Sequence, residues 1–199
     1  MGGVQRINFA CCSAKDLVSD KLEIGTTVYR SAAAEEMLRL LKSRPRPTVL
    51  DFGPLLRENV EMLSGLHCKM FIEDYHQGLS DDPFAGISEG SLDAVLCWDM
   101  LNYLRRDAGH LLVQAIKPYM RPGGVILVQI ASSQYVSKYP LRFRLIDRQH
   151  MSCEVESSET VVREPFTSRA IHTMLEGFKP MHSLHLRNGL QEHLFSFLR

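Results

Sequence analysis

Four short apolar runs recur along the chain, each bounded by polar or turn-forming residues. They are "TVLDF" (48–52), "KMFIED" (69–74), "LDAVLCW" (92–98) and "VILVQIA" (125–131). Runs of this length that are rich in β-branched and aromatic residues predict buried strands. The last run is apolar almost without interruption, which is typical of a strand covered on both faces.

Helical periodicity occupies the stretches between these runs. Ser31 is placed to cap a helix, and "RPRP" (44–47) ends it. The apolar stripe of this helix comprises Ala34, Met37, Leu38 and Leu41. A shorter helix is predicted over 58–64, ending at Gly65.

A longer helical region runs up to Met120. Asp107 is the predicted cap of its main helix, with Leu111, Leu112, Ala115 and Ile116 on the buried side. "RPGG" (121–124) then predicts a tight turn, because proline presets one turn residue and glycine allows a positive φ at the next.

The C-terminal fifth predicts one helix and one hairpin. Thr167 is placed to cap a helix that carries Ile171, Met174 and Leu175, and Phe166 is spaced from Ile171 as a hydrophobic staple. Gly177 ends the helix. "MHSLHL" and "EHLFSFL" then flank Asn188-Gly189, a dipeptide that predicts an antiparallel hairpin.

Strands that alternate with helices predict an α/β fold with a doubly wound, mostly parallel sheet, to which the C-terminal hairpin adds an antiparallel strand. The 199 residues fit a single domain. We interpret 1–27 as an N-terminal arm and 132–165 as a lid or substrate-side insertion. The alternation in "LRFRLIDRQHMSCEVE" predicts a small strand pair within that insertion.

Composition excludes several classes of protein. Lys and Arg number 23 and Asp and Glu number 23, so we expect no nucleic-acid partner, which would need a concentrated basic face. Five scattered cysteines indicate reduced thiols, and no Cys-x-x-Cys spacing or converging histidine set predicts a metal site. The sequence shows no signal peptide and no membrane-spanning run, so we expect a cytoplasmic protein.

Five segments in order resemble the class I S-adenosylmethionine-dependent methyltransferases, over a stretch from about residue 30 to the end. They are "VLDFG" (49–53), "FIED" (71–74), "EGSLDAVLCWDMLNYL" (89–104), "MRPGGVILV" (120–128) and the closing hairpin. The resemblance implies a Rossmann-like, seven-stranded sheet with one antiparallel strand. It also implies S-adenosylmethionine as cofactor and methyl transfer to an acceptor, a small molecule or a protein side chain, that the sequence does not identify.

The expected cofactor residues lie at the ends of the first two strands. In open α/β sheets, ligands bind beyond the carboxyl ends of the strands, where the strand order reverses. Asp51 ends the first strand, and Gly53 would let the backbone approach a ligand closely. Glu73 follows Asp51 by about 20 positions, the separation expected for an acid that binds ribose hydroxyls, and Asp74 is a near-equal alternative.

A second cluster follows the "LDAVLCW" strand. Trp98, Asn102 and Tyr103 are candidate cofactor contacts, since aromatic faces attract a sulfonium cation. Asp99 is the candidate catalytic base, because a carboxylate can accept the proton of a nucleophile. In the alternative interpretation, Trp98 and Tyr103 pack under the next helix and Asp99 caps it.

The cofactor loop departs from the family pattern. Leu55 and Arg57 stand where the family has further glycines, and Pro54 removes a backbone donor. The segment 73–92 is short for a full third strand, so we expect a rudimentary one. Asp81 and Asp82 are candidates for contact with adenine, or they begin a turn before Pro83.

Two functions therefore remain open. The first is a methyltransferase, and the second is a catalytically inactive methyltransferase-like binding or scaffold protein. A dinucleotide-dependent oxidoreductase is a poorer third, because a pyrophosphate needs a glycine-rich loop even more.

Overall fold

The computed structural model describes residues 22–186 and 189–198. Its central sheet has six strands in the order β10-β11-β5-β4-β2-β3. These strands are β2 (Thr48–Asp51), β3 (Lys69–Ile72), β4 (Leu92–Trp98), β5 (Met120–Ala131), β10 (Phe178–His185) and β11 (Leu190–Phe197). β3, β2, β4 and β5 run parallel, and β11 is antiparallel to both β5 and β10. The predicted α/β sheet with its C-terminal hairpin is confirmed, with Gly189 at φ 82° in the connecting turn; Asn188 lies outside the described residues.

Helices and two small sheets surround this sheet. The helices are α1 (Ala32–Lys42), α2 (Arg57–Ser64), α3 (Arg106–Ile116) and α4 (Ser168–Met174), with 3-10 turns η1 (Met100–Tyr103) and η2 (Lys117–Tyr119). One small sheet has the order β1-β8-β7 and the other pairs β6 with β9. Their bounds are β1 (Gly25–Arg30), β6 (Tyr135–Ser137), β7 (Arg142–Leu145), β8 (His150–Val155) and β9 (Thr160–Val162). No helix in the described part of the chain is long and apolar enough to cross a bilayer.

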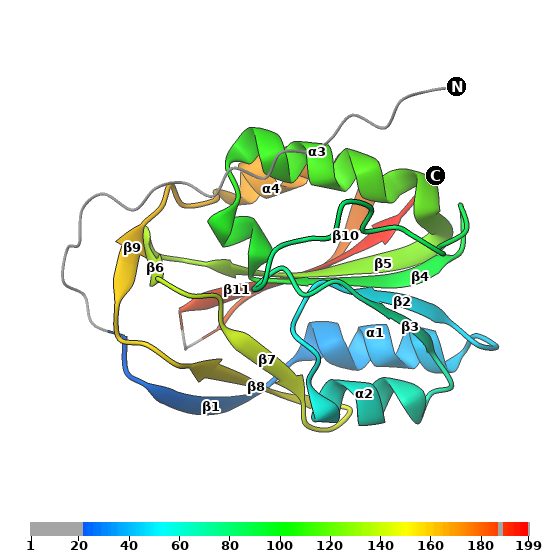
Figure 1. The fold of residues 1–199 in the computed structure, drawn as a ribbon, viewed down its shortest axis with the longest axis horizontal. Helices are drawn as coiled ribbons and strands as arrows, with labels where there is room; N and C mark the ends of the chain where they lie inside the picture. The colour runs from blue at the N-terminus through cyan, green and yellow to red at the C-terminus, as the bar shows by residue number, and fades with distance from the viewer. Residues whose placement is uncertain (1–21, 187–188, 199) are drawn as a thin grey trace.

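The layers follow from the alternation of side chains along the central strands. α3 and α4 cover one face of the six-stranded sheet, while α1, α2 and the β1-β8-β7 sheet lie on the other (Figure 1). In β4, Val95 and Cys97 point to the α3–α4 side, and Ala94 and Leu96 point to the α1 side. Both faces are buried, as the nearly continuous apolar runs predicted.

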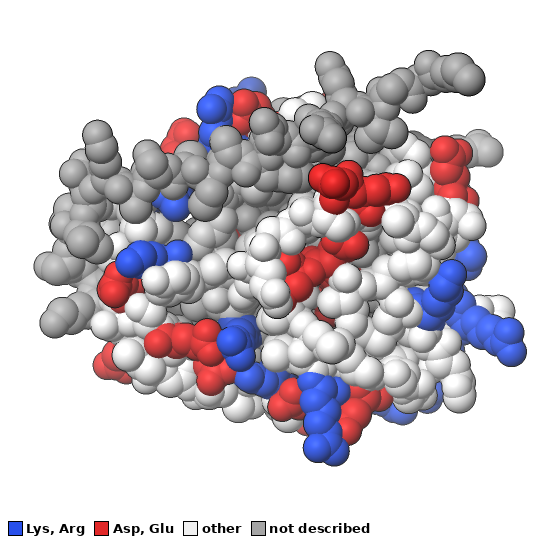
Figure 2. Space-filling view, viewed as in Figure 1, with Lys and Arg blue, Asp and Glu red and all other residues white. Residues whose placement is uncertain are grey.

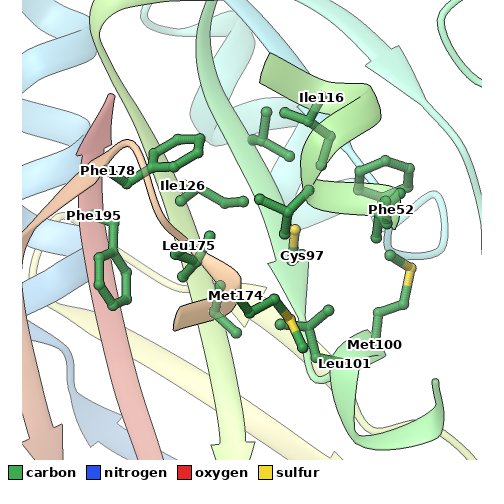
Figure 3. Packing of buried hydrophobic residues seen from close by; sticks show 14 of the residues in the cluster. Phe52, Cys97, Met100, Leu101, Ile116, Ile126, Met174, Leu175, Phe178 and Phe195 are labelled. Atoms are coloured by element: carbon green, nitrogen blue, oxygen red, sulfur yellow. The ribbon is translucent and has the colours of Figure 1, made fainter. Parts of the chain in front are cut away.

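The core on the α3–α4 side is closed by the C-terminal helix. Figure 3 shows Cys97 and Ile126 from the sheet pointing toward Met174 of α4 and Leu175, the C-cap of that helix. The Thr167 hydroxyl accepts a hydrogen bond from the Ala170 N–H at 3.1 Å, which confirms the predicted cap. On the opposite face, Ser31 caps α1 in the same way, through the Ala34 N–H at 2.9 Å.

The sheet has six strands rather than the seven that the resemblance implied. The described residues contain no strand between Ile72 and Leu92, so the expected rudimentary third strand is absent there. Instead, that segment forms turns, in one of which the Asp82 carboxylate accepts the Phe84 N–H. Too few residues connect β3 to β4 for a further strand and its return.

Two local predictions were wrong. A third, the N-terminal arm, is not tested over residues 1–21, which lie outside the described part; its last residues, 25–27, belong to β1, which pairs with β8. Asp107 lies in the first turn of α3, whose N-cap is Arg105, and Leu111 is 54% exposed. "RPGG" belongs to β5, where the register with β4 shifts between the pairs Leu92–Met120 and Ala94–Val125, so that a bulge replaces the predicted turn.

A buried carboxylate ties the C-terminal strand to the first helix. Glu192 of β11 is fully buried and accepts hydrogen bonds from the Ser31 hydroxyl at 2.6 Å and the Ala33 N–H at 3.1 Å. The Gln129 amide of β5 donates a third bond to it at 3.0 Å. An acid at the amino end of α1 also complements the positive end of the helix dipole. One side chain thus joins three elements that are far apart in sequence.

Substituting Glu192 should lower the free energy of unfolding more than substituting an exposed acid does. We expect Glu192→Ala to lower the free energy of unfolding by about 2–3 kcal/mol, because three buried donors lose their acceptor. Urea unfolding monitored by circular dichroism measures the change, with the exposed Glu176→Ala as control. Equal unfolding midpoints for the two variants would contradict this account of α1 docking.

Candidate functional site

The strand order reverses beside β2. β2 pairs with β3 on one side and β4 on the other, and the chain leaves all three strands at the same edge of the sheet. This is the position at which open α/β sheets bind ligands. The predicted cofactor residues follow the three strands at this edge, so the topology brings them together.

The turn after β2 is organised by Asp51, which is 1% exposed. One of its carboxylate oxygens accepts the Gly53 N–H at 2.8 Å and the Trp98 indole N–H at 2.5 Å. Burial raises the pKa of Asp51 to about 6, and the two hydrogen bonds partly oppose that rise. Asp51 therefore shapes the loop from inside the protein and does not present its carboxylate to the outside.

Gly53 is required by the protein's own tryptophan. A Cβ at this position would lie 2.6 Å from Nε1 and 2.7 Å from Cδ1 of Trp98. The close approach that the sequence predicted at Gly53 therefore exists, but the group that approaches is the indole of Trp98. Any larger residue here would displace that indole and break its bond to Asp51.

The missing glycines of the loop cost no backbone strain. Neither Leu55 nor Arg57 has a positive φ, so the loop follows a path open to ordinary residues. Leu55 is 69% exposed and does not plug the crevice, and Arg57 begins α2 and pairs with Glu61. The N-cap of α2, Leu56, provides no side-chain acceptor, so no cap competes for the first N–H groups of the helix.

Trp98 forms an inner wall of the site. It is 2% exposed, has a φ of 45° and stacks on Phe143 of β7, with ring centroids 5.6 Å apart and planes inclined by 2°. Asn59 of α2 holds β7 in place, since its amide donates to the Phe143 carbonyl and accepts the Leu145 N–H. The β7–β8 strand pair predicted in the insertion is confirmed, and it packs against the site through Phe143.

Asp99 is buried and fully engaged by the protein. One carboxylate oxygen accepts the Tyr75 hydroxyl at 2.5 Å, and the other accepts the Leu141 N–H at 2.9 Å. Asp99 is 1% exposed, and burial raises its pKa to about 6. An acid with that pKa is largely ionised at neutral pH and can accept a proton once a donor is displaced.

Tyr75 is the site residue that sequence reasoning missed. It follows β3, and its hydroxyl reaches Asp99 after β4; because β2 lies between these strands, the side chain passes over the end of β2. Burial first, and then the charge of Asp99, raises the pKa of Tyr75 well above its usual value, so it remains a donor. An aromatic residue immediately after the paired acids of "FIED" was the available signal.

Asn102 and Tyr103 anchor neighbouring segments. The Asn102 side chain accepts the Ala131 N–H at 3.1 Å and lies 3.4 Å from the Gln129 carbonyl. The Tyr103 hydroxyl lies within 3.1 Å of the carbonyl oxygens of Ser137 and Tyr139. Their polar groups thus bind β5 and the segment after β6, and a role in cofactor contact stays a prediction.

Glu73 is the least committed acid at this edge. Its backbone N–H extends the pairing with β2 through the Asp51 carbonyl, and its half-buried carboxylate accepts only the long 3.3 Å bond from the Ser80 N–H among the described residues. Asp74 instead stabilises a turn by accepting from the His76 N–H and the Gln77 amide. Between the two alternatives, Glu73 has more free acceptor capacity for a ribose.

Comparison with known proteins shows which fold this geometry belongs to. No protein-family model and no curated protein matches the chain. Among solved structures, 109 chains match. One is the Burkholderia thailandensis 1,6-didemethyltoxoflavin-N1-methyltransferase, solved with S-adenosylhomocysteine, which is 18% identical with a TM-score of 0.50 over 84% of this chain and 79% of that one. The chain has the class I S-adenosylmethionine-dependent methyltransferase fold.

Two further structures carry the same methyltransferase fold. A candidate methyltransferase from Thermobifida fusca is 14% identical, with a TM-score of 0.54 over 84% of this chain and 79% of that one. A TehB-like S-adenosylmethionine-dependent methyltransferase from Corynebacterium glutamicum is 12% identical, with a TM-score of 0.50 over 84% and 89%. The agreement covers most of each chain, so the methyltransferase fold extends across the sheet and its helices.

The burial of Asp99 predicts a pH-dependent stability. An acid whose pKa is higher in the folded than in the unfolded state destabilises the fold as pH rises through the window from about 4 to 6. Asp99→Asn carries no charge, so its unfolding free energy relative to the wild type should rise by on the order of 2–3 kcal/mol from pH 4.5 to pH 7.5.

Denaturant unfolding at the two pH values tests this prediction. Asp107→Asn is the control, because a hydrogen bond from the Ala108 N–H lowers the pKa of that exposed acid and its substitution should give no such rise. A difference between wild type and Asp99→Asn that does not change with pH would show that Asp99 is not a buried, ionising acid.

Proposed function

We propose that the protein binds S-adenosylmethionine at the carboxyl edge of β2, β3 and β4 and transfers its methyl group to an acceptor. The supporting observation is the ordered Asp51–Gly53 turn, which leads into α2 beside the available Glu73 carboxylate, at the point where the strand order reverses. This is the place and the chemistry that a nucleoside-bearing cofactor requires in an open α/β sheet.

The residues present fit the ribose and the carboxylate of the cofactor. Glu73 supplies acceptor oxygens for the ribose hydroxyls, and the uncapped first turn of α2 supplies N–H donors for the carboxylate of the methionine moiety. At the methionine end, Trp98 and Tyr75 occupy the space above Gly53 and Asp99. Binding at that end therefore requires these two aromatic side chains to turn away from the crevice.

The proposed chemistry depends mainly on positioning. When bound, the cofactor would supply an electrophilic methyl group, whose transfer to a lone pair of the acceptor would convert the sulfonium to a neutral thioether. Asp99 would take the acceptor's proton once the Tyr75 hydroxyl no longer donates its hydrogen bond to the Asp99 carboxylate. A pKa of about 6 leaves Asp99 ionised at neutral pH.

A second candidate is a methyltransferase-like binding module without catalysis. The observation that favours it is the filling of the crevice by the chain itself: the Trp98 indole lies against Gly53, and both oxygens of Asp99 accept bonds from the protein. In that case Asp51, Trp98 and Tyr75 hold the fold together and bind no cofactor.

Cofactor binding separates the two candidates. We expect calorimetric titration with S-adenosylmethionine or S-adenosylhomocysteine to give saturable binding, and Glu73→Ala to weaken it about tenfold or more, because a ribose loses its acceptor. Glu61→Ala removes the same charge from the exposed face of α2 and serves as control. No heat and no thermal shift at millimolar ligand would favour the binding module.

The Tyr75 hydroxyl should hold the crevice closed. Because Trp98 is the only tryptophan in the sequence, its fluorescence reports directly on the site. We expect Tyr75→Phe, which removes the bond to Asp99, to raise the association rate constant for S-adenosylmethionine by about threefold or more in stopped-flow experiments, since the open state is more populated. The control is Tyr119→Phe in η2, whose ring stacks on Phe84; unchanged kinetics in Tyr75→Phe would remove Tyr75 from this role.

A further inference from the structure

A cavity lies at the opposite edge of the sheet from the candidate site. It has a volume of about 830 Å³ and is formed by the end of α1, the α1–β2 connection, the α2–β3 connection and the turn between β7 and β8. We call it the basic pocket, because its charged lining residues are Lys42, Arg44, Arg46, Lys69 and Arg148, with His67 beside them and no acid. Figure 2 shows Lys and Arg side chains projecting at the right-hand end of the molecule, where Figure 1 places the α1–β2 connection.

Four of these five cations have no acidic partner. Arg44 is committed to the protein, since it pairs with the buried Asp93 at 3.0 Å and donates to the Gly123 carbonyl at 3.1 Å. The other four form no ion pair with any residue that the structure describes. Elsewhere, arginines such as Arg39, Arg57 and Arg105 pair with nearby acids. Four cations without an ion-pair partner among the described residues thus line one hollow.

Helix dipoles do not account for this charge. α1 ends at Lys42 and α2 ends at Ser64, so two carboxyl-terminal helix ends lie at the pocket. Each helix end is equivalent to about half a negative charge, and together they balance about one cation. Roughly three positive charges remain for a ligand.

The backbone of the pocket takes a left-handed conformation at two of its lining residues. Arg46 has a φ of 49° and His67 a φ of 58°, a conformation that favours glycine. Besides these two, Trp98 at the candidate site is the one non-glycine residue with positive φ in the described part. Arg46 also precedes Pro47, which restricts its backbone further. The left-handed residue His67 lies in the turn that follows α2, where the Cys68 N–H donates to the Leu63 carbonyl at 3.1 Å. At Arg46, a side chain kept where glycine would fit more easily indicates a use for that side chain.

We propose that the basic pocket binds a small, multiply phosphorylated molecule. Arg46, Arg148, Lys42 and Lys69 would surround its phosphate oxygens, with Arg46 and Arg148 able to bind two oxygens each. The volume lies in the usual range of small-molecule sites. These basic residues line a single cavity, so they form a compact hollow and not the extended stripe that a nucleic-acid backbone needs.

Inorganic triphosphate is the probe that tests this site, since it lacks the adenosine that the cofactor crevice would bind. Calorimetric titration of the full chain at low salt should give saturable binding that weakens steeply as salt is added. Arg46→Gly removes the charge and relieves the left-handed backbone, so it should weaken triphosphate about tenfold or more while the melting temperature stays equal or rises. Arg148→Ala should weaken binding to a similar extent.

Lys179→Ala is the matched control, because it removes an exposed, unpaired cation from β10, outside the pocket. Its triphosphate affinity should remain within about twofold of the wild type. Equal weakening in Lys179→Ala and Arg46→Gly, absence of saturable triphosphate binding, or binding of an oligonucleotide in place of triphosphate would each overturn the proposal. None of these results depends on whether S-adenosylmethionine binds at the other edge.

Discussion

The buried carboxylate of Asp51 is the constraint on which the rest of the carboxyl edge depends. Its acceptor oxygen requires two donors, because a buried acid without hydrogen bonds is costly. Gly53 supplies one and the Trp98 indole supplies the other. Once Trp98 is fixed there, Phe143 stacks on it and brings β7 against the sheet. A single hydrogen-bonding requirement therefore positions the turn after β2, the Trp98 side chain and strand β7.

The same constraint defines what binding at this edge would involve. Trp98 and Tyr75 each hold a buried acid, so neither can turn away unless another group satisfies Asp51 or Asp99. A cationic, hydrogen-bonding ligand can do both, since a sulfonium is attracted to carboxylates and to aromatic faces. The two aromatic residues thus make occupancy of the crevice depend on the chemistry of the ligand.

The two edges of the sheet are electrostatically opposite. Acids and aromatic hydroxyls gather at the carboxyl edge, around Asp51, Glu73 and Asp99, whereas unpaired cations such as Arg46 and Arg148 gather at the amino edge. The balanced overall charge of the chain hides this separation, because opposite excesses cancel in the total. One small domain therefore presents an acidic edge and a basic edge, which suit ligands of opposite charge.

The sequence alone determined the alternating strands and helices, the caps at Ser31 and Thr167 and the acids at the strand ends, because local periodicity and hydrogen-bonding rules fix them. Only the tertiary structure decided that Trp98 fills the space beside Gly53, that Tyr75 reaches Asp99 over β2, and that Arg148 joins Arg46 in one pocket. These contacts join residues far apart along the chain. Their geometry depends on strand order and on how the insertion packs, and no local pattern encodes either.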